Sequence, residues 1–240
     1  MRKRSELDQA EDAECELQLT AAREEGSIIK CIVVRCHQSK STFAHVVPCK
    51  GADEDGYVVN LLVADISWLG HVRLILKTDQ EVSLLALVTQ TSKVMKFKVE
   101  DLESLTTEQS AAYESQSNGA TEVAVRAIRG FGRTLRLCLE ARIGKKVPDG
   151  HPLMAWLLEH AALLLNVTVR GEDGLTPWAR VRGRAFNQRL FGYGESVIAK
   201  QPPKGPQHDV DGNMGARQHL GVFVGYCRSS NAYRVVLGDG

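Results

Sequence analysis

This 240-residue sequence lacks long apolar runs and closely paired cysteines. Its longest apolar segment, residues 157–169, is interrupted by Glu159, His160 and Asn166 and is too short to cross a bilayer. The first residues are charged and lead into a polar stretch, without the apolar region of a secretory signal. None of the six cysteines forms a C-x-x-C pair, and no two histidines stand beside them at zinc-ligand spacing. We therefore expect an intracellular protein, in the nucleus or the cytoplasm, with no membrane partner.

The composition is typical of a soluble globular protein, with 43% hydrophobic and 25% charged residues. The length allows one α/β domain with a sizeable core and a small appended module. The net charge of +1 hides an asymmetry, because residues 1–122 hold 13 Lys and Arg against 20 Asp and Glu, while residues 123–240 hold 17 against 9. The basic half suggests a surface that faces a polyanion, although solvated helix faces account for part of the excess.

The apolar pattern predicts a mixed α/β protein in which strands and helices alternate. A hairpin is expected at 28–35 and 42–47, followed by a helix at 53–68 that ends near Gly70, a strand at 72–76, a helix at 81–91 and a strand at 94–99. A polar loop is expected at 100–120, and two longer helices at 121–143 and 152–166. Short strands are expected at 196–199, 220–226 and 233–237.

The same pattern divides the chain into three segments. Residues 1–26 are polar with little periodicity, which predicts a disordered or frayed N-terminal segment. Residues 27–184 carry the α/β core, and residues 185–240, where Gly and Pro become frequent, form a small β-rich module.

A basic stripe follows the helix predicted at 121–143. At about 100° per residue, Glu122, Arg126, Arg129, Arg133 and Arg136 fall within roughly 40° of one line along this helix. Apolar residues lie on the opposite side, namely Ala124, Ile128, Phe131, Leu135 and Leu139. Pairing with Glu122 four residues away accounts for Arg126 alone. Aligned arginines suit phosphates along the helix face, and a plain solvated face is the alternative.

A second carboxylate, Asp79, directly follows an apolar strand. Ligands gather at the carboxyl ends of strands in open α/β sheets, although an Asp there is more often a turn or a helix cap. Asp79 and Glu122 could share divalent metal ions that assist phosphoryl transfer. Since Mg²⁺ prefers a few carboxylates with water and substrate phosphate, a third carboxylate would normally be expected.

Five segments in order resemble the integrases of copia-type retrotransposons. Ser115-Gln-Ser-Asn-Gly-Ala-Thr-Glu122 is similar to the motif that opens that family's catalytic-glutamate helix, and Leu74-Ile-Leu-Lys-Thr-Asp-Gln-Glu81 resembles the strand and turn of its second catalytic Asp. The 42 residues between Asp79 and Glu122 fit the family's carboxylate separation. The remaining likeness lies in the buried helix at 152–166, in Thr176-Pro-Trp with Gly183-Arg184, and in the G-x-F-x-G-Y and Y-R-V pattern at 220–236.

The resemblance implies a ribonuclease-H-like mixed sheet with helices on both faces, followed by the small β-rich module. It implies a polynucleotidyl transferase that joins DNA ends to a target duplex, with Mg²⁺ or Mn²⁺ held by Asp79 and Glu122. Its partner would be DNA, with self-association into a homo-oligomer as a further option. The residues expected to contact nucleic acid are Asn118, Arg126, Arg129, Arg133 and Arg136.

The sequence also departs from the family pattern. The opening strand with the first catalytic Asp has no convincing counterpart, and Asp12 is a weak substitute because its neighbours lack β-branched residues. Val82 stands where the family usually has Pro, and the N-terminal zinc module is absent. We therefore expect a truncated integrase whose strand transfer is impaired by the loss of one carboxylate. The alternatives are a non-catalytic DNA-binding remnant and an unrelated α/β interaction domain.

Overall fold

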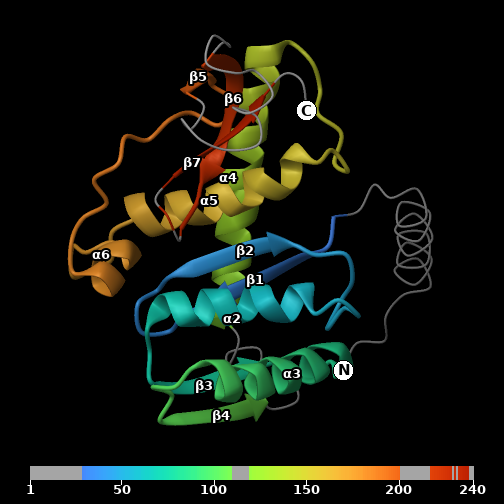
Figure 1. Ribbon diagram of the computed structural model, residues 1–240, viewed down its shortest axis with the longest axis vertical. Helices are drawn as coiled ribbons and strands as arrows, with labels where there is room; N and C mark the ends of the chain where they lie inside the picture. The colour runs from blue at the N-terminus through green and yellow to red at the C-terminus, as the bar shows by residue number, and fades with distance from the viewer. Residues whose placement is uncertain (1–28, 110–118, 201–216, 229, 231, 238–240) are drawn as a thin grey trace, which may run out of the picture.

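The computed structural model describes residues 29–109, 119–200, 217–228, 230 and 232–237 (Figure 1). Two predicted site residues, Asp12 and Asn118, lie outside these ranges. The described elements follow the order β1 (Cys31–Arg35), β2 (Thr42–Val46), α2 (Tyr57–Leu69), β3 (Arg73–Thr78), α3 (Val82–Lys98), β4 (Ser104–Gln109), α4 (Gly119–Ile143), α5 (Leu153–Thr168), α6 (Pro177–Arg182), β5 (Ser196–Lys200), β6 (Gln218–Tyr226) and β7 (Tyr233–Leu237). The mixed α/β class predicted from the sequence is confirmed.

Strands β1 and β2 form the predicted antiparallel hairpin, with helices on both of its faces. Val33 lies opposite Ala44 in the register, and both pack with Ile128 of α4 and Ala162 of α5. The alternate residues of β1, including Ile32, face the core formed with α2 and α3. Because both faces are covered, β2 is buried along most of its length, although it contains the polar residues Thr42 and His45.

Strands β3 and β4 pair in parallel and are connected by α3. Every second residue of β3 is half-buried against the core, including Leu74 and Leu76, while Ile75 on the other face is 62% exposed. Two sequence predictions were wrong in this region: residues 94–98 continue α3, where a strand was expected, and the loop predicted at 100–120 contains strand β4.

The strands of the N-terminal half do not join into one mixed sheet. In the described part of the chain they form two separate pairs, β1–β2 and β3–β4. The pairs nevertheless border one apolar core, which is filled by α2 and α3 and includes Val58, Leu62, Leu87 and Met95. The helices thus hold together two small sheets where the sequence predicted a single mixed one.

Local signals in the sequence set the ends of the helices. The carboxylate of Asp53 accepts hydrogen bonds from the backbone N–H groups of Tyr57 (2.9 Å) and Val58 (2.7 Å), so it caps the otherwise unpaired start of α2. Gly70 ends α2 in a left-handed conformation with φ of 68°, which glycine adopts without steric cost. The predicted end of α4 at Gly144 is confirmed, with φ of 69°.

Helices α4 and α5 pack across each other above the β1–β2 hairpin in the view of Figure 1, and α4 continues behind the hairpin through most of the height of the molecule. Close packing at the crossing depends on a glycine, because a Cβ atom at Gly132 would lie 3.2 Å from the Cδ2 atom of Leu158. Helix α5 buries residues around most of its circumference, as its sequence predicts. No helix among the described residues is long and apolar enough to span a membrane.

The three predicted C-terminal strands are confirmed and form an antiparallel sheet in the order β5–β6–β7. This sheet packs on α5 and shares two apolar clusters with the rest of the chain. One cluster is aromatic, and it brings Phe223 and Tyr226 of β6 near Trp178 of α6 and Trp68 of α2. The sheet therefore completes the core that α5 belongs to.

Candidate functional site

Helix α4 displays the predicted basic stripe. Glu122 lies in its first turn, and Arg126, Arg129 and Arg133 follow on the exposed side. On the other side Ala124, Ile128 and Leu139 are buried, which fixes the rotation of the helix. Within the described ranges, none of these three guanidinium groups forms an ion pair with a carboxylate. They are therefore available to an external anion.

Arg136, the fourth arginine of the stripe, is held by intramolecular contacts. Its guanidinium group donates to Glu140 (3.0 Å), to Asp149 and to the carbonyl of Val147 (2.5 Å). The hydrogen bond with Glu140 raises the pKa of Arg136, with a further contribution from Asp149. Arg136 thus anchors the chain that follows α4.

Asp79 lies directly after β3, at an exposed position. Because β3 and β4 are parallel, with Thr78 opposite Gln109, their carboxyl ends share one edge of the small sheet. Helix α4, which carries Glu122, packs against β1 and α5. The expected metal site would require Asp79 and Glu122 to meet across this part of the fold.

In the described part of the chain, no three His, Cys, Asp or Glu side chains gather where they could hold a metal ion. Asp79 and Glu122 supply two carboxylates, which is fewer than a Mg²⁺ pair usually takes from a protein. The described residues therefore do not complete a metal site, and no catalytic step follows from them.

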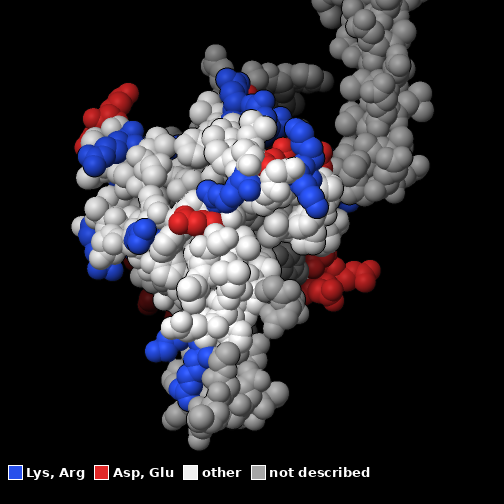
Figure 2. All heavy atoms as spheres, turned by 90° about the horizontal axis from the view of Figure 1, so that it is seen from above, with Lys and Arg blue, Asp and Glu red and all other residues white. Residues whose placement is uncertain are grey.

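Basic side chains extend beyond the stripe. Seen from above, toward the C-terminal end of α4, the molecule shows more Lys and Arg than Asp and Glu (Figure 2). Exposed residues at and after this end of α4 include Arg142, Lys145 and Lys146. These exposed basic residues give this end of the molecule a positive surface that can attract a polyanion.

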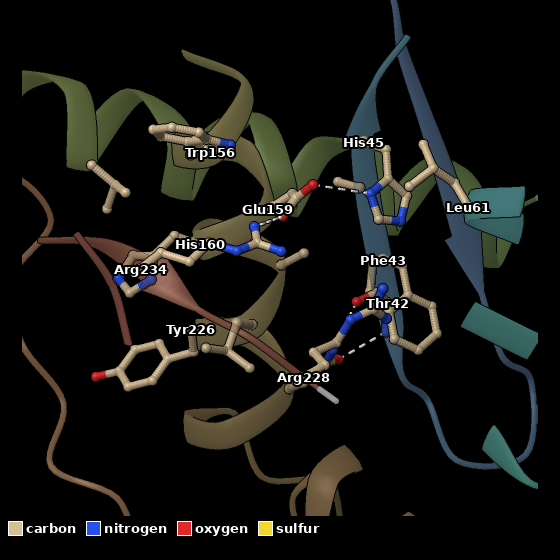
Figure 3. A pocket seen from close by; sticks show the side chains of 16 residues that line it. Thr42, Phe43, His45, Leu61, Trp156, Glu159, His160, Tyr226, Arg228 and Arg234 are labelled. Atoms are coloured by element: carbon tan, nitrogen blue, oxygen red, sulfur yellow. Dashed lines mark hydrogen bonds and ion pairs between the residues drawn. The ribbon is translucent and has the colours of Figure 1, made fainter. Parts of the chain in front are cut away.

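A charge network that the sequence did not predict connects β2, α2, α5 and the C-terminal sheet, with His45 and Asp65 buried at its centre and the other members partly exposed. The imidazole of His45 lies between two carboxylates. Its Nε2 atom is 2.8 Å from Asp65, and its Nδ1 atom is 3.3 Å from Glu159, the contact that Figure 3 shows. Arg228 donates to Asp65 (2.5 Å), and Arg234 donates to Glu159 (2.5 Å). Positive and negative groups therefore alternate along one chain of five side chains.

The charges of this network decide its protonation state. Burial alone would lower the pKa of His45, but hydrogen bonds and charges of Asp65 and Glu159 outweigh it and raise the pKa to about 9. His45 is therefore a cation at neutral pH. Burial also opposes ionisation of Glu159, yet the hydrogen bonds from His45 and Arg234 lower its pKa. Because Asp65 and Glu159 pair with the two different ring nitrogens of His45, these three residues form two linked ion pairs and not a metal site.

A cavity of about 90 Å³ lies beside this network (Figure 3). Its walls come from β2, α5 and the β6–β7 region, and they include His45, Glu159, His160, Arg228 and Arg234. The sequence offered a weak signal for this region, because Asp65 interrupts an apolar helix and Glu159 and His160 interrupt the longest apolar run. Nothing in their spacing shows that side chains up to 163 residues apart would meet.

Fold and surface together define an α/β protein with a basic helix face and a separate charge network. No family model matches the sequence, and no curated protein matches it. Among solved structures, the chain is similar to the catalytic core domain of BIV integrase, with a TM-score of 0.40 and 20% identity, over 63% of this chain and 84% of that one. It is also similar to a chain of the simian T-cell lymphotropic virus intasome in complex with the PP2A regulatory subunit B56 gamma, with a TM-score of 0.45 and 13% identity, over 87% of this chain and 70% of that one.

Proposed function

We propose that this protein is an integrase-related DNA-binding protein that contacts the phosphate backbone through the exposed face of α4. The observation that carries the proposal is the row of Arg126, Arg129 and Arg133, exposed and without a carboxylate partner among the described residues. Guanidinium groups bind phosphate oxygens with two parallel hydrogen bonds, and successive helix turns can follow a backbone. The copia-type motifs around Glu122 and Asp79 support an integrase ancestry.

Strand transfer is the catalytic activity that we propose in addition to DNA binding. Asp79 and Glu122 would be the remaining ligands of Mg²⁺ or Mn²⁺, and Asn118 a further contact of the DNA. Arg136 is not kept as a DNA contact, because its guanidinium group is occupied by Glu140, Asp149 and the carbonyl of Val147. Because two of the three carboxylates of the family's metal site are identified in this sequence, we expect strand transfer far below that of an integrase with all three. A strand-transfer assay with purified protein, Mg²⁺ and a labelled donor duplex measures this activity. Efficient joining of the donor to the target would contradict the expected impairment.

DNA binding is tested by reversing charge on the stripe. Changing Arg129→Glu and Arg133→Glu together should reduce duplex affinity by at least a hundredfold, because two phosphate contacts become repulsions. The matched control changes Lys93→Glu and Lys96→Glu on the exposed side of α3, which alters the net charge equally and should reduce affinity only several-fold. Fluorescence anisotropy with a labelled duplex gives both values. Equal losses in the two variants would show that net charge alone attracts DNA.

Salt dependence separates this proposal from an unrelated α/β interaction domain. Each phosphate contact contributes about −0.9 to the slope of log affinity against log salt concentration. Three arginine contacts therefore predict a slope of about −3, which should fall to about −1 when Arg129 and Arg133 are replaced by Gln. Binding that ignores salt would favour the interaction domain. A non-catalytic remnant would bind DNA equally well after Asp79→Ala or Glu122→Ala and would join no ends.

A further inference from the structure

Helix α4 has a third face, which belongs neither to its buried side nor to the arginine stripe. At about 100° per residue, this face lies roughly 100° around the helix axis from the stripe. It contains no charged residue and consists of Val123, Ala127, Gly130, Thr134, Leu137 and Ala141. Its two large side chains are well exposed, Val123 at 59% and Leu137 at 60%. We call these six residues the outer face of α4.

The outer face is not covered by the described part of the chain. Val123 and Leu137 belong to none of its apolar clusters. A Cβ atom at Gly130 would meet nothing within 4 Å, whereas Gly132, on the side that packs against α5, has close neighbours. Aliphatic side chains arranged along one helix face normally pack against another element. The outer face therefore has the character of a contact surface for a partner helix.

The order of residues along the outer face favours a second copy of the chain as that partner. Val123 stands seven residues before Gly130, and Leu137 stands seven residues after it. If two α4 helices pack antiparallel and cross at Gly130, Val123 of each copy meets the partner's Leu137, as a two-fold axis requires. A seven-residue spacing keeps such side chains on the contact line of two helices. The small residues Ala127, Gly130 and Thr134 between them allow the two backbones to approach closely.

The two-fold axis also fixes where the arginine stripes would lie. Because the stripe borders the outer face on the same side in both copies, the two stripes meet along one side of the helix pair. Arg126 stands four residues before Gly130 and Arg133 three residues after it, so Arg126 of one copy lies beside the partner's Arg133. These guanidinium groups repel each other in the free protein. A DNA backbone along the helix pair would neutralise them, because its phosphates bind guanidinium groups strongly.

We propose that the outer face of α4 joins two copies of this chain, antiparallel about Gly130, and that the dimer presents one DNA-binding surface made of both stripes. The DNA part of this inference rests on the proposed function, whereas the contact between the helices does not. A single pair of helices makes a small contact, at the low end of specific interfaces. The free protein should therefore associate weakly, and duplex DNA should strengthen the dimer.

Disulfide trapping tests the contact, because a two-fold axis at Gly130 brings this residue next to its own copy. Gly130→Cys is made in a background in which Cys15, Cys31 and Cys138 are changed to Ser, and the open space around Gly130 accepts the new side chain. Lys93→Cys on the exposed side of α3 is the matched control. After mild oxidation of the whole protein, we expect at least fivefold more linked dimer from Gly130→Cys than from the control.

A disruptive variant and the salt dependence complete the test. Leu137→Lys, at an exposed position, should reduce the linked dimer of Gly130→Cys at least fivefold. Without DNA, the yield should rise from low salt to about 1 M salt, where the Debye length is only about 3 Å and the repulsion between the arginines is screened. At low salt, a duplex should raise the yield to the same level.

Each part of the inference has its own contradicting result. Equal linking by the two cysteine variants, or a yield that Leu137→Lys leaves unchanged, would overturn the contact and leave the outer face to a different partner. Linking in 1 M salt that a duplex does not promote at low salt would overturn the joined surface. Fluorescence anisotropy reports DNA binding separately, so failure of the proposed function is recognised as absent DNA binding with undiminished linking in 1 M salt.

Discussion

Asn166 holds β2 to α5 through two hydrogen bonds. Its side-chain oxygen accepts from the backbone N–H of Thr42 (2.8 Å), and its amide nitrogen donates to the Thr42 carbonyl (2.7 Å). Both residues are buried. In Asn166→Ala, the N–H and C=O groups of Thr42 would be buried without partners, so the free energy of unfolding should fall by about 2–3 kcal/mol. Urea denaturation measures the change, and the exposed control Asn60→Ala should stay within about 0.5 kcal/mol of the unmodified protein.

His45 makes stability depend on pH in the alkaline range. Its pKa is raised from 6.5 to about 9 in the folded protein, so the folded state holds its proton more tightly than the unfolded state does. The stabilisation is complete below pH 6.5 and is lost as pH rises through 9, with a total of about 3 kcal/mol. His45→Gln should be less stable at pH 6 and should lose this slope. A slope that is identical in both proteins between pH 6.5 and 9 would contradict the assignment.

Single residues were the least predictable part of the site. The helical spacing of the α4 arginines was visible in the sequence, and three of them are exposed as expected. One partner of Arg136, Glu140, lies four residues on in the same helix and could have been read from the spacing. The other two, Asp149 and the carbonyl of Val147, come from the loop after the helix, and no helix pattern could show them. The His45 network was not predicted for a similar reason, because its members lie on five separate segments that only tertiary packing brings together.

Among the elements, α4 and α5 depend on close approach at one glycine. A Cβ atom at Gly132 would lie 3.2 Å from Leu158 and 3.7 Å from Leu157, whereas Gly130 has open space around it. Gly132→Val should therefore destabilise the protein by about 1–3 kcal/mol through overpacking. Gly130→Ala, two residues away, should stabilise it by about 0.5–1 kcal/mol because alanine favours the helix. Thermal unfolding compares the two variants. If Gly132→Val does not lower the stability, the two helices must lie further apart than described.

Elements with strong apolar periodicity were predicted well, and the two errors have physical causes. Val94, Met95 and Phe97 look strand-like in isolation, but α3 buries Leu87, Thr91 and Met95 at four-residue spacing, and no Gly or Pro interrupts it. Strand β4 has one half-buried side chain, Leu105, and five exposed ones. Its pairing with β3 comes from backbone hydrogen bonds, which a hydropathy pattern does not reveal.

At the scale of the whole molecule, Asp65 links the two halves of the fold, because it is fully buried in α2 and paired with His45 of β2 and with Arg228, which follows β6. Asp65→Asn removes the negative charge between two cations, so the free energy of unfolding should fall by about 3–5 kcal/mol. Because the network spans both halves of the fold, we expect one cooperative transition before and after the change. Tryptophan fluorescence and circular dichroism should give the same midpoint in each protein. Two separated transitions would mean that the halves unfold independently.

The arrangement of the C-terminal sheet has a genetic consequence. A nonsense codon at position 228 would delete Arg228, Arg234 and the whole of β7. Asp65 and Glu159 would then lack their arginine partners, and β6 with its aromatic residues would lack its neighbouring strand. Such late stop codons should abolish accumulation of the protein in cells as completely as early ones.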